Sequence, residues 1–272
     1  MDGHRRVMSD IDAATTGQVN ATAAETYETF FVPALFGQWP DRVLDAAGLG
    51  AGDDVLDVGC GTGIVARAAA RRLDRTGSVT GIDINDGMLA VAQRAPEPVV
   101  WRQGPAEELP FPDASFDRVV SQFAFMFFAD QSAALEEMVR VMRPGGTITI
   151  ATWAAIDESP GYAAMIKLLA RLFGSDVAAA LEAPFTLGTE GELMRVLRDG
   201  LPGASISRHE GVARFASIKA WVHTDIRGWT LADMIDDSQY ADLLTAARTE
   251  LAAFTDGDGQ VRFAAPALIA TT

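Results

Sequence analysis

With 272 residues, of which 49% are hydrophobic and 22% charged, the chain is long enough to bury one large core and is not composed like a disordered protein. A formal net charge of −15 opposes binding to nucleic acids and to anionic membrane surfaces, so neither is expected as a partner. The one cysteine, Cys60, excludes a disulfide within the chain.

The N-terminal residues 1–48 are predicted to form a helical cap. The first residues are polar and lack the apolar stretch of a signal peptide. Between residues 22 and 47, apolar side chains recur at a helical spacing that Pro33 and Pro40 interrupt, which predicts two or three short helices. No run of about 18 apolar residues occurs, so no membrane insertion is expected and the cytoplasm is the predicted location.

Residues 49–154 are predicted to form a Rossmann-like core, because short apolar runs alternate with segments of helical composition. Strands are expected at 55–58, 78–84, 99–103, 116–123 and 147–153, and helices at 64–73, 87–94 and 131–142. This alternation indicates βαβ units with right-handed crossovers. The fold class is therefore α/β, a doubly wound parallel sheet with helices on both faces.

After Trp153 the alternation of strands and helices changes. Helices are expected at 162–173, 176–182, 190–198 and through most of 217–254, and strand segments at 204–215 and 261–270. The segments 155–186 and 217–255 are interpreted as helical lid insertions over one edge of the sheet. Because no linker separates them from the rest, we expect residues 155–272 to complete a single structural domain with the cap and the core.

A glycine-rich turn, Asp57-Val58-Gly59-Cys60-Gly61-Thr62-Gly63, follows the first strand of the core. Glycines let the backbone approach a ligand without a Cβ, and the next helix begins with unpaired N–H groups. The spacing G-x-G-x-G departs from the dinucleotide pattern G-x-G-x-x-G. Asp57 beside the turn and Asp83 at the end of the second strand suit a cationic, ribose-bearing ligand such as S-adenosylmethionine (SAM). The alternative is structural, with Asp57 as a turn former and Asp83 as a strand-end cap.

Four stretches occur in a characteristic order. They are VLDVGCGTG at 55–63, VTGIDINDGMLAVA at 79–92, QGPAEELPFPDASFDRVVSQ at 103–122 and EEMVRVMRPGGTITIATW at 136–153. In this combination the chain resembles class I SAM-dependent methyltransferases of the ubiquinone/menaquinone-biosynthesis-like small-molecule group. The resemblance implies a mostly parallel seven-stranded sheet with an antiparallel last strand and a helical lid. It also implies an enzyme that transfers a methyl group from SAM to a small molecule.

The resemblance also implies roles for individual residues. The turn would hold the methionine part of SAM, Asp83 would bind the ribose hydroxyls, and Gln122 would lie near the methyl group. The implied cofactor contacts are Asp57, Gly59, Cys60, Gly61, Gly63, Asp83, Ile84, Met88, Ala106, Glu107 and Gln122. One departure is Pro105, where family members commonly carry Asp, so the usual carboxylate contact to the adenine amino group is missing.

An aromatic run, Phe123-Ala124-Phe125-Met126-Phe127-Phe128, follows the fourth strand, where the mouth of the site is expected. Core packing accounts for at least half of these side chains, and one or two rings are expected to line an acceptor pocket. The candidate pocket residues are Tyr27, Phe123, Phe127, Trp153 and Trp221, with Trp229 as a further candidate. Such a pocket suits an apolar or aromatic small molecule.

No catalytic set of nucleophile and base is recognisable, and no cluster has metal-ligand spacing. Methyl transfer from a sulfonium depends more on positioning the acceptor than on a base. His223, near Asp225 in the predicted lid, is the one candidate base, and a solvated helix face is its alternative interpretation. The catalytic residues are therefore left unassigned.

Two other functions stay open. A non-catalytic SAM-binding module is compatible with Pro105 and with the lack of an evident base. An NAD(P)-dependent oxidoreductase on a Rossmann fold is opposed by the glycine spacing and by the lack of a Tyr-x-x-x-Lys pair, since Tyr162 and Lys167 stand one residue too far apart. A small-molecule substrate is the expected partner, and a homodimer stays open.

Overall fold

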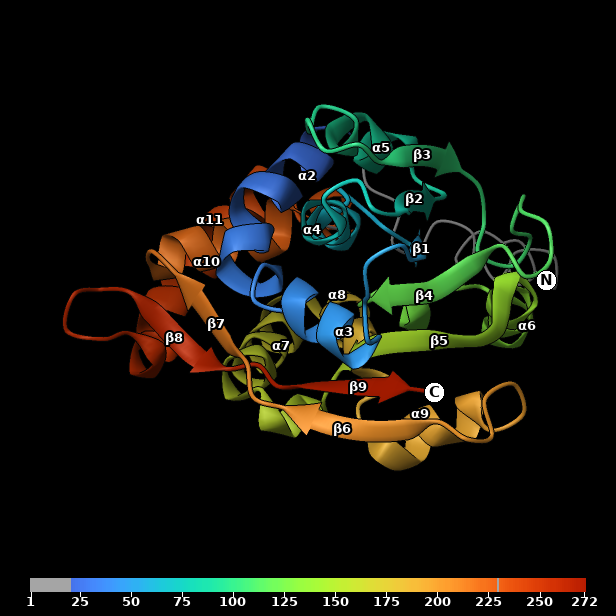
Figure 1. Ribbon diagram of the computed structural model, residues 1–272. Helices are drawn as coiled ribbons and strands as arrows, with labels where there is room; N and C mark the ends of the chain where they lie inside the picture. Colours follow the sequence, from blue (N-terminus) through green and yellow to red (C-terminus); the bar gives the residue numbers. More distant parts are fainter. Residues whose placement is uncertain (1–20, 229) are drawn as a thin grey trace, which may run out of the picture.

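The computed structural model describes residues 21–228 and 230–272 (Figure 1). Its main sheet has seven strands in the order β3-β2-β1-β4-β5-β9-β6, of which β9 runs antiparallel to both of its neighbours. The strands are β1 (Asp54–Val58), β2 (Ser78–Asp83), β3 (Val100–Gln103), β4 (Phe116–Gln122), β5 (Met142–Trp153), β6 (Ser205–His209) and β9 (Ala267–Thr271). The predicted fold class, a mostly parallel seven-stranded sheet with an antiparallel last strand, is confirmed.

Helices cover both faces of this sheet. Central strands such as β1 are buried almost without interruption, which requires cover on both sides. The helix α3 packs beside α4, and α6 packs beside α9. The helices of the core are α3 (Pro40–Ala46), α4 (Ile64–Leu73), α5 (Asp86–Ala92), α6 (Gln131–Val141) and α9 (Glu190–Leu197).

Side-chain caps fix where several helices begin. The Asn85 side chain accepts a hydrogen bond from the Met88 N–H at 3.0 Å and so starts α5. Asp130 accepts two backbone N–H groups at the start of α6. Thr189 forms a capping box with Glu192 in α9. These caps explain why the predicted helix starts lie within a residue or two of the observed ones.

The remaining helices form a group beyond the carboxyl ends of the parallel strands (Figure 1). The N-terminal cap consists of α2 (Ala21–Thr26) and the π-helix η1 (Tyr27–Phe36), and it contacts α5, α10 and β7. The other members are α7 (Pro160–Phe173), α8 (Ser175–Glu182), α10 (Ile218–Arg227) and α11 (Asp237–Glu250). Short 3-10 turns are η2 (Phe125–Phe127), η3 (Ile156–Glu158), η4 (Ala183–Phe185), η5 (Thr230–Asp233) and η6 (Ala252–Phe254). In the described part of the chain, none of the helices combines the length and the apolar character needed to cross a membrane.

Two segments predicted as single strands are each divided. Residues 204–215 form β6 and then β7 (Val212–Phe215), while residues 261–270 form β8 (Val261–Ala264) and then β9. The two breaks lie side by side, because the Ala265 N–H donates to the Gly211 carbonyl at 2.9 Å. A Cβ on Gly211 would lie only 2.2 Å from the Ala265 oxygen, so a glycine is needed at this break. Pro266 has no N–H to continue a ladder. As a result, β7 and β8 leave the main sheet and pair as a separate two-stranded antiparallel sheet.

The strand β5 begins at Met142, five residues before the predicted start at Thr147. Met142 pairs with Phe116, and an irregularity separates this pair from the regular ladder that resumes at Arg118 and Thr147. The intervening Arg143 is held by ion pairs to Asp54 and Asp117, which keeps the Pro-Gly-Gly segment against the sheet.

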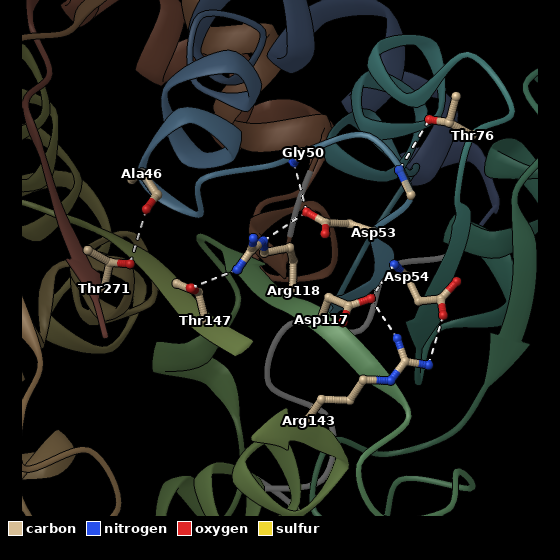
Figure 2. Close-up of polar contacts among 11 residues, drawn as sticks. Ala46, Gly50, Asp53, Asp54, Thr76, Asp117, Arg118, Arg143, Thr147 and Thr271 are labelled. Carbon is tan, nitrogen blue, oxygen red and sulfur yellow. Dashed lines mark hydrogen bonds and ion pairs between the residues drawn. The ribbon is translucent and has the colours of Figure 1, made fainter. Parts of the chain in front are cut away.

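These ion pairs belong to a polar network at the amino ends of the parallel strands (Figure 2). Arg118 of β4 donates to Asp53 at 2.9 Å and to Thr147 of β5 at 3.0 Å. Arg143 donates to Asp54 at 2.8 Å and also to Asp117. The network joins β1, β4 and β5 at the edge opposite their carboxyl ends, so their carboxyl ends are held in fixed relative positions.

Candidate active site

A cavity of about 350 Å³ opens at the carboxyl ends of β1, β2 and β4. The strand order reverses beside β1, and such switch points are where doubly wound sheets bind ligands. Four segments supply the lining: the glycine turn, the end of β2, residues 104–107 and the segment after β4. Tyr27 and Phe36 of the cap complete it.

The three glycines of the turn all have positive φ, at +69° for Gly59, +54° for Gly61 and +82° for Gly63. A Cβ on Gly59 would lie 2.5 Å from the Ala124 Cβ, and one on Gly63 would lie 2.2 Å from the Trp101 ring. A Cβ on Gly61 would meet nothing within 4 Å. Gly59 and Gly63 are therefore required for packing, whereas Gly61 leaves the backbone open towards the cavity.

Asp83 is held at the end of β2 by backbone donors on both carboxylate oxygens. The Gly61 N–H donates to Oδ2 at 2.7 Å and the Asn85 N–H donates to Oδ1 at 2.8 Å. Burial raises the pKa of Asp83, and these hydrogen bonds oppose the rise. The carboxylate thus faces the cavity in a fixed orientation and ties the glycine turn to β2.

Asp57 lies below the turn with 1% of its surface exposed. Its Oδ2 accepts the Ala66 N–H of α4 at 3.0 Å. Burial raises the pKa of Asp57 to about 7, and the neighbouring Asp83 carboxylate adds to the rise. Together with Glu107 they place three carboxyl groups on the cavity wall, and among the described residues that line it there is no Lys, Arg or His. The cavity therefore favours a cationic ligand.

Two further polar atoms on the cavity wall are buried without a hydrogen-bond partner among the described residues. They are Oγ1 of Thr62 in the glycine turn and Oε1 of Gln122 at the end of β4. A buried polar atom without a partner costs free energy. A ligand that offers complementary groups at these two atoms would offset this cost.

The cavity also has an aromatic wall. It consists of Tyr27, Phe36, Phe123, Phe127 and Phe128. Tyr27 stacks on Phe36 with ring centroids 5.0 Å apart, and Phe36 contacts Phe123 at 5.6 Å. Phe123 has a φ of +55°, which is strained for a bulky residue, and its N–H donates to the Ala151 carbonyl at 2.8 Å. The strained backbone turns the Phe123 ring into the wall where β4 ends.

The comparisons with known proteins agree with this geometry. A family model described as a methyltransferase domain matches residues 56–150. The chain is 34% identical over 169 residues to the ubiquinone/menaquinone biosynthesis C-methyltransferase UbiE of Chromobacterium violaceum, a match that covers 59% of this chain and 69% of that protein. The chain belongs to the class I SAM-dependent methyltransferases. The methyltransferase is also 42% identical over 113 residues to the demethylmenaquinone methyltransferase of Staphylococcus aureus, which covers 40% of this chain and 47% of that one.

Solved structures show the same fold. A SAM-dependent methyltransferase from Aquifex aeolicus superposes with a TM-score of 0.51 at 17% identity, covering 92% of this chain and 99% of that one. Phosphoethanolamine N-methyltransferase 2 of Haemonchus contortus, solved with S-adenosylhomocysteine, superposes with a TM-score of 0.59 at 20% identity. The match covers 96% of this chain and 59% of that one. At these identities the likeness establishes the fold alone.

The cavity brings together nearly all of the cofactor contacts expected for the methyltransferase. Those that line it are Asp57, Gly59, Cys60, Gly61, Asp83, Ile84, Met88, Ala106, Glu107 and Gln122. Gly63 is not among the lining residues, and its position against the Trp101 ring explains why a glycine is needed there. Pro105 lines the cavity beside Ala106 and offers neither an N–H nor a side-chain acceptor.

The expected acceptor-pocket residues divide into two groups. Tyr27, Phe123 and Phe127 line the cavity. Trp153 packs behind the wall, and Trp221 is fully buried in the helical group, 4.7 Å from the Phe263 ring, so neither lines the cavity. The further candidate Trp229 lies outside the described residues.

His223, the one candidate base, does not line the cavity. Its ring meets the edge of Phe30 on the outer side of the cap, with ring centroids 5.6 Å apart. Burial lowers its pKa, and the charges of Arg227 and Lys219 lower it further. The geometry therefore gives His223 no contact with the reacting groups.

Several residues that line the cavity were not among the individual candidates. Thr62 and Phe128 were named only as members of the glycine turn and the aromatic run, whereas Phe36 and Asn85 were not considered. The position of Asn85 as a helix cap directly after Asp83 was a usable signal, since a capping side chain orders the backbone that holds the carboxylate. No sequence pattern marks Phe36, because a π-helix changes which face its residues present.

Proposed function

We propose that the methyltransferase binds SAM in this cavity and transfers its methyl group to an apolar or aromatic small molecule held against the aromatic wall. The observation that carries the proposal is that one cavity is lined both by three carboxyl groups, with no Lys, Arg or His among its described lining residues, and by five aromatic rings. Both kinds of residue meet where β1, β2 and β4 end, which is the place where this fold binds ligands.

On the cofactor side, the residues present fit SAM. Asp57 and Asp83 would stabilise its sulfonium and ammonium charges, and Asp83 would also accept hydrogen bonds from the ribose hydroxyls. Thr62 Oγ1 would donate to the methionine carboxylate together with the first N–H groups of α4. The exposed side chain of Ile84 and the nearby Met88 would pack on the adenine, with the Ala106 N–H at the ring edge.

On the acceptor side, the residues position a substrate and exclude water. Bound SAM supplies a methyl group that its sulfonium already activates for in-line displacement. Tyr27 is the polar group of the aromatic wall. Burial and the carboxylates of Glu28, Asp83 and Asp57 raise its pKa above the usual range, so Tyr27 stays neutral and donates a hydrogen bond instead of acting as a base. The wall therefore suits an acceptor whose reacting atom is already electron-rich.

The proposed class of acceptor is supported by the residues that line the cavity more than by the names of the relatives. The relatives' names refer to ubiquinone and menaquinone biosynthesis, which supports an aromatic acceptor. However, the matched domain ends at residue 150, before the helices α7 to α11 begin. Tyr27 and Phe36, which also lie outside that domain, shape the acceptor side of this chain.

The test is a turnover screen with SAM, read as S-adenosylhomocysteine formed, on acceptors matched in size. Neutral aromatic acceptors, aliphatic amines and phosphorylated acceptors form the three arms. We expect turnover in the neutral aromatic arm and little in the phosphorylated arm, because the cavity is acidic. Calorimetry with SAM and S-adenosylhomocysteine runs beside the screen. Turnover confined to charged acceptors contradicts the acceptor class, and absence of binding at millimolar SAM contradicts the cofactor site.

A further inference from the structure

The cap covers the cavity, and its two ends contact the core differently. At its C-terminal end, Phe31, Ala34, Leu35 and Phe36 of η1 belong to the main hydrophobic core. At its N-terminal end, the apolar contact is a small cluster in which Ala23 and Ala24 meet Met88 of α5. Two ion pairs add to this contact. Glu25 pairs with Arg94 at 3.1 Å, and Glu28 pairs with Arg67 at 2.8 Å.

The two ion pairs differ in environment. The side chains of Arg94 and Glu25 are 62% and 56% exposed, so solvent and salt screen that pair. The side chains of Arg67 and Glu28 are 20% and 28% exposed. Oε2 of Glu28 is buried and has no hydrogen-bond partner among the described residues, so Arg67 is the group that holds this carboxylate. Removing Arg67 would leave the Glu28 carboxylate unpaired in a partly buried place.

Arg67 also contacts the glycine turn. It lies in the first turn of α4, and its Nε donates to the Gly63 carbonyl at 3.3 Å while its Nη2 donates to Glu28 Oε1. One side chain therefore connects the end of the cofactor turn to the cap. Glu28 directly follows Tyr27 in η1, and Tyr27 faces the cavity while Glu28 faces α4. The far end of η1 is fixed by Phe31 and Phe36 in the main core, on which the Tyr27 ring packs. Holding Glu28 anchors the first turn of η1 and thereby contributes to the placement of the Tyr27 ring.

We propose that the Glu28–Arg67 pair positions the cap of this methyltransferase, so that closure over the cavity and placement of Tyr27 depend on the state of the glycine turn. The proposal rests on the proposed function, because it requires SAM to bind at that turn. Glu28 and Arg67 act through Tyr27 and Gly63 and are positioning residues. SAM held on the turn and the closed cap then stabilise each other, as linkage requires.

The test compares Glu28→Gln with Glu25→Gln, which removes the same charge from the exposed pair of the same cap. We expect Glu28→Gln to weaken SAM binding about tenfold, equivalent to roughly 1.4 kcal/mol, and to increase hydrogen exchange in residues 21–36. Glu25→Gln is expected to stay within about twofold of the unsubstituted protein. The exchanged pair Glu28→Arg with Arg67→Glu is expected to bind SAM more tightly than Arg67→Glu alone.

Three outcomes are decisive. Equal SAM dissociation constants for Glu28→Gln and Glu25→Gln would overturn the inference. A lower melting temperature for Glu28→Gln with unchanged SAM affinity and unchanged exchange would show a merely structural pair and also overturn it. Failure of the unsubstituted protein to bind SAM would instead overturn the proposed function, so the two failures are distinguishable.

Discussion

Phe123 and Trp153 stack face to face, with ring centroids 3.8 Å apart and ring planes 7° from parallel. Phe123 lines the cavity, whereas Trp153 lies behind it with 3% of its surface exposed. The pair joins the ends of two neighbouring strands, β4 and β5. Trp153 thus supports the aromatic wall from behind without contributing to its surface.

Replacing Trp153 with leucine is expected to affect acceptor binding more than cofactor binding. The change leaves a void behind Phe123, costs about 2–3 kcal/mol of stability and lets the Phe123 ring move away from the cavity. We expect KM for the acceptor to rise several-fold while the SAM dissociation constant stays nearly unchanged. Steady-state kinetics and calorimetry measure the two quantities.

The matched control is Trp221→Leu, because Trp221 is equally buried but packs among Phe215, Phe254 and Phe263 away from the cavity. It should lose comparable stability and keep the KM of the acceptor. If both variants raise that KM equally, the effect comes from general destabilisation and Trp153 has no specific support role.

Substitutions of Gly61 and Gly63 are expected to separate ligand binding from folding. Gly61→Ala places its methyl in open space at the cavity, so it should cost about 1 kcal/mol of stability for the positive φ but strongly weaken SAM binding. Gly63→Ala places its methyl against Trp101 and should cost about 3 kcal/mol. Thermal melts and SAM titrations report the two effects. A Gly61→Ala protein with normal SAM affinity would show that no ligand approaches this backbone.

The core could be predicted from the sequence because its signals are local. In β1, β2 and β4 a short, largely buried stretch is followed by a turn or a helix cap, and the glycine turn and Asp83 lie at strand ends. Because the carboxyl ends of parallel strands share one edge, this placement was enough to bring Asp57, Asp83 and Gln122 to one cavity.

The parts that could not be predicted depend on contacts between distant segments. The separation of β7 from β6 follows from the approach of Gly211 to Ala265, over 50 positions apart in the sequence. The burial of Trp221 depends on Phe215 and Phe263, which belong to the two-stranded sheet of β7 and β8. A tryptophan in an amphipathic helix looks the same whether it faces a pocket or a hydrophobic core, so its role could not be assigned from the helix alone.

Asp83→Asn is expected to weaken SAM binding about 10- to 100-fold. It removes the charge from a carboxylate that two backbone N–H groups hold in place and that we propose binds the ribose and the cationic part of SAM. Asp86→Asn is the control, since Asp86 is exposed at the start of α5. Calorimetry measures the SAM affinity of both variants. Equal affinity for Asp83→Asn and the unsubstituted protein would overturn the assignment of the ribose site.

The pKa of Asp57, raised to about 7, makes both stability and SAM affinity depend on pH. In the unfolded chain this group titrates near 4, so between pH 4 and 7 the folded protein without ligand binds more protons than the unfolded chain. Its contribution to stability is therefore complete below about pH 4 and is lost as the pH rises through 7.

Binding of cationic SAM has the opposite pH dependence, because it favours the ionised Asp57. We expect SAM affinity to increase from pH 6 to 8 and to level off above, with proton release on binding near pH 7. Calorimetry in two buffers of different ionisation enthalpy measures the release. Asp57→Asn should bind SAM more weakly and with little dependence on pH in this range. A pH dependence that persists unchanged in Asp57→Asn would assign the titration to another group, with Asp83 as the next candidate because burial raises its pKa as well.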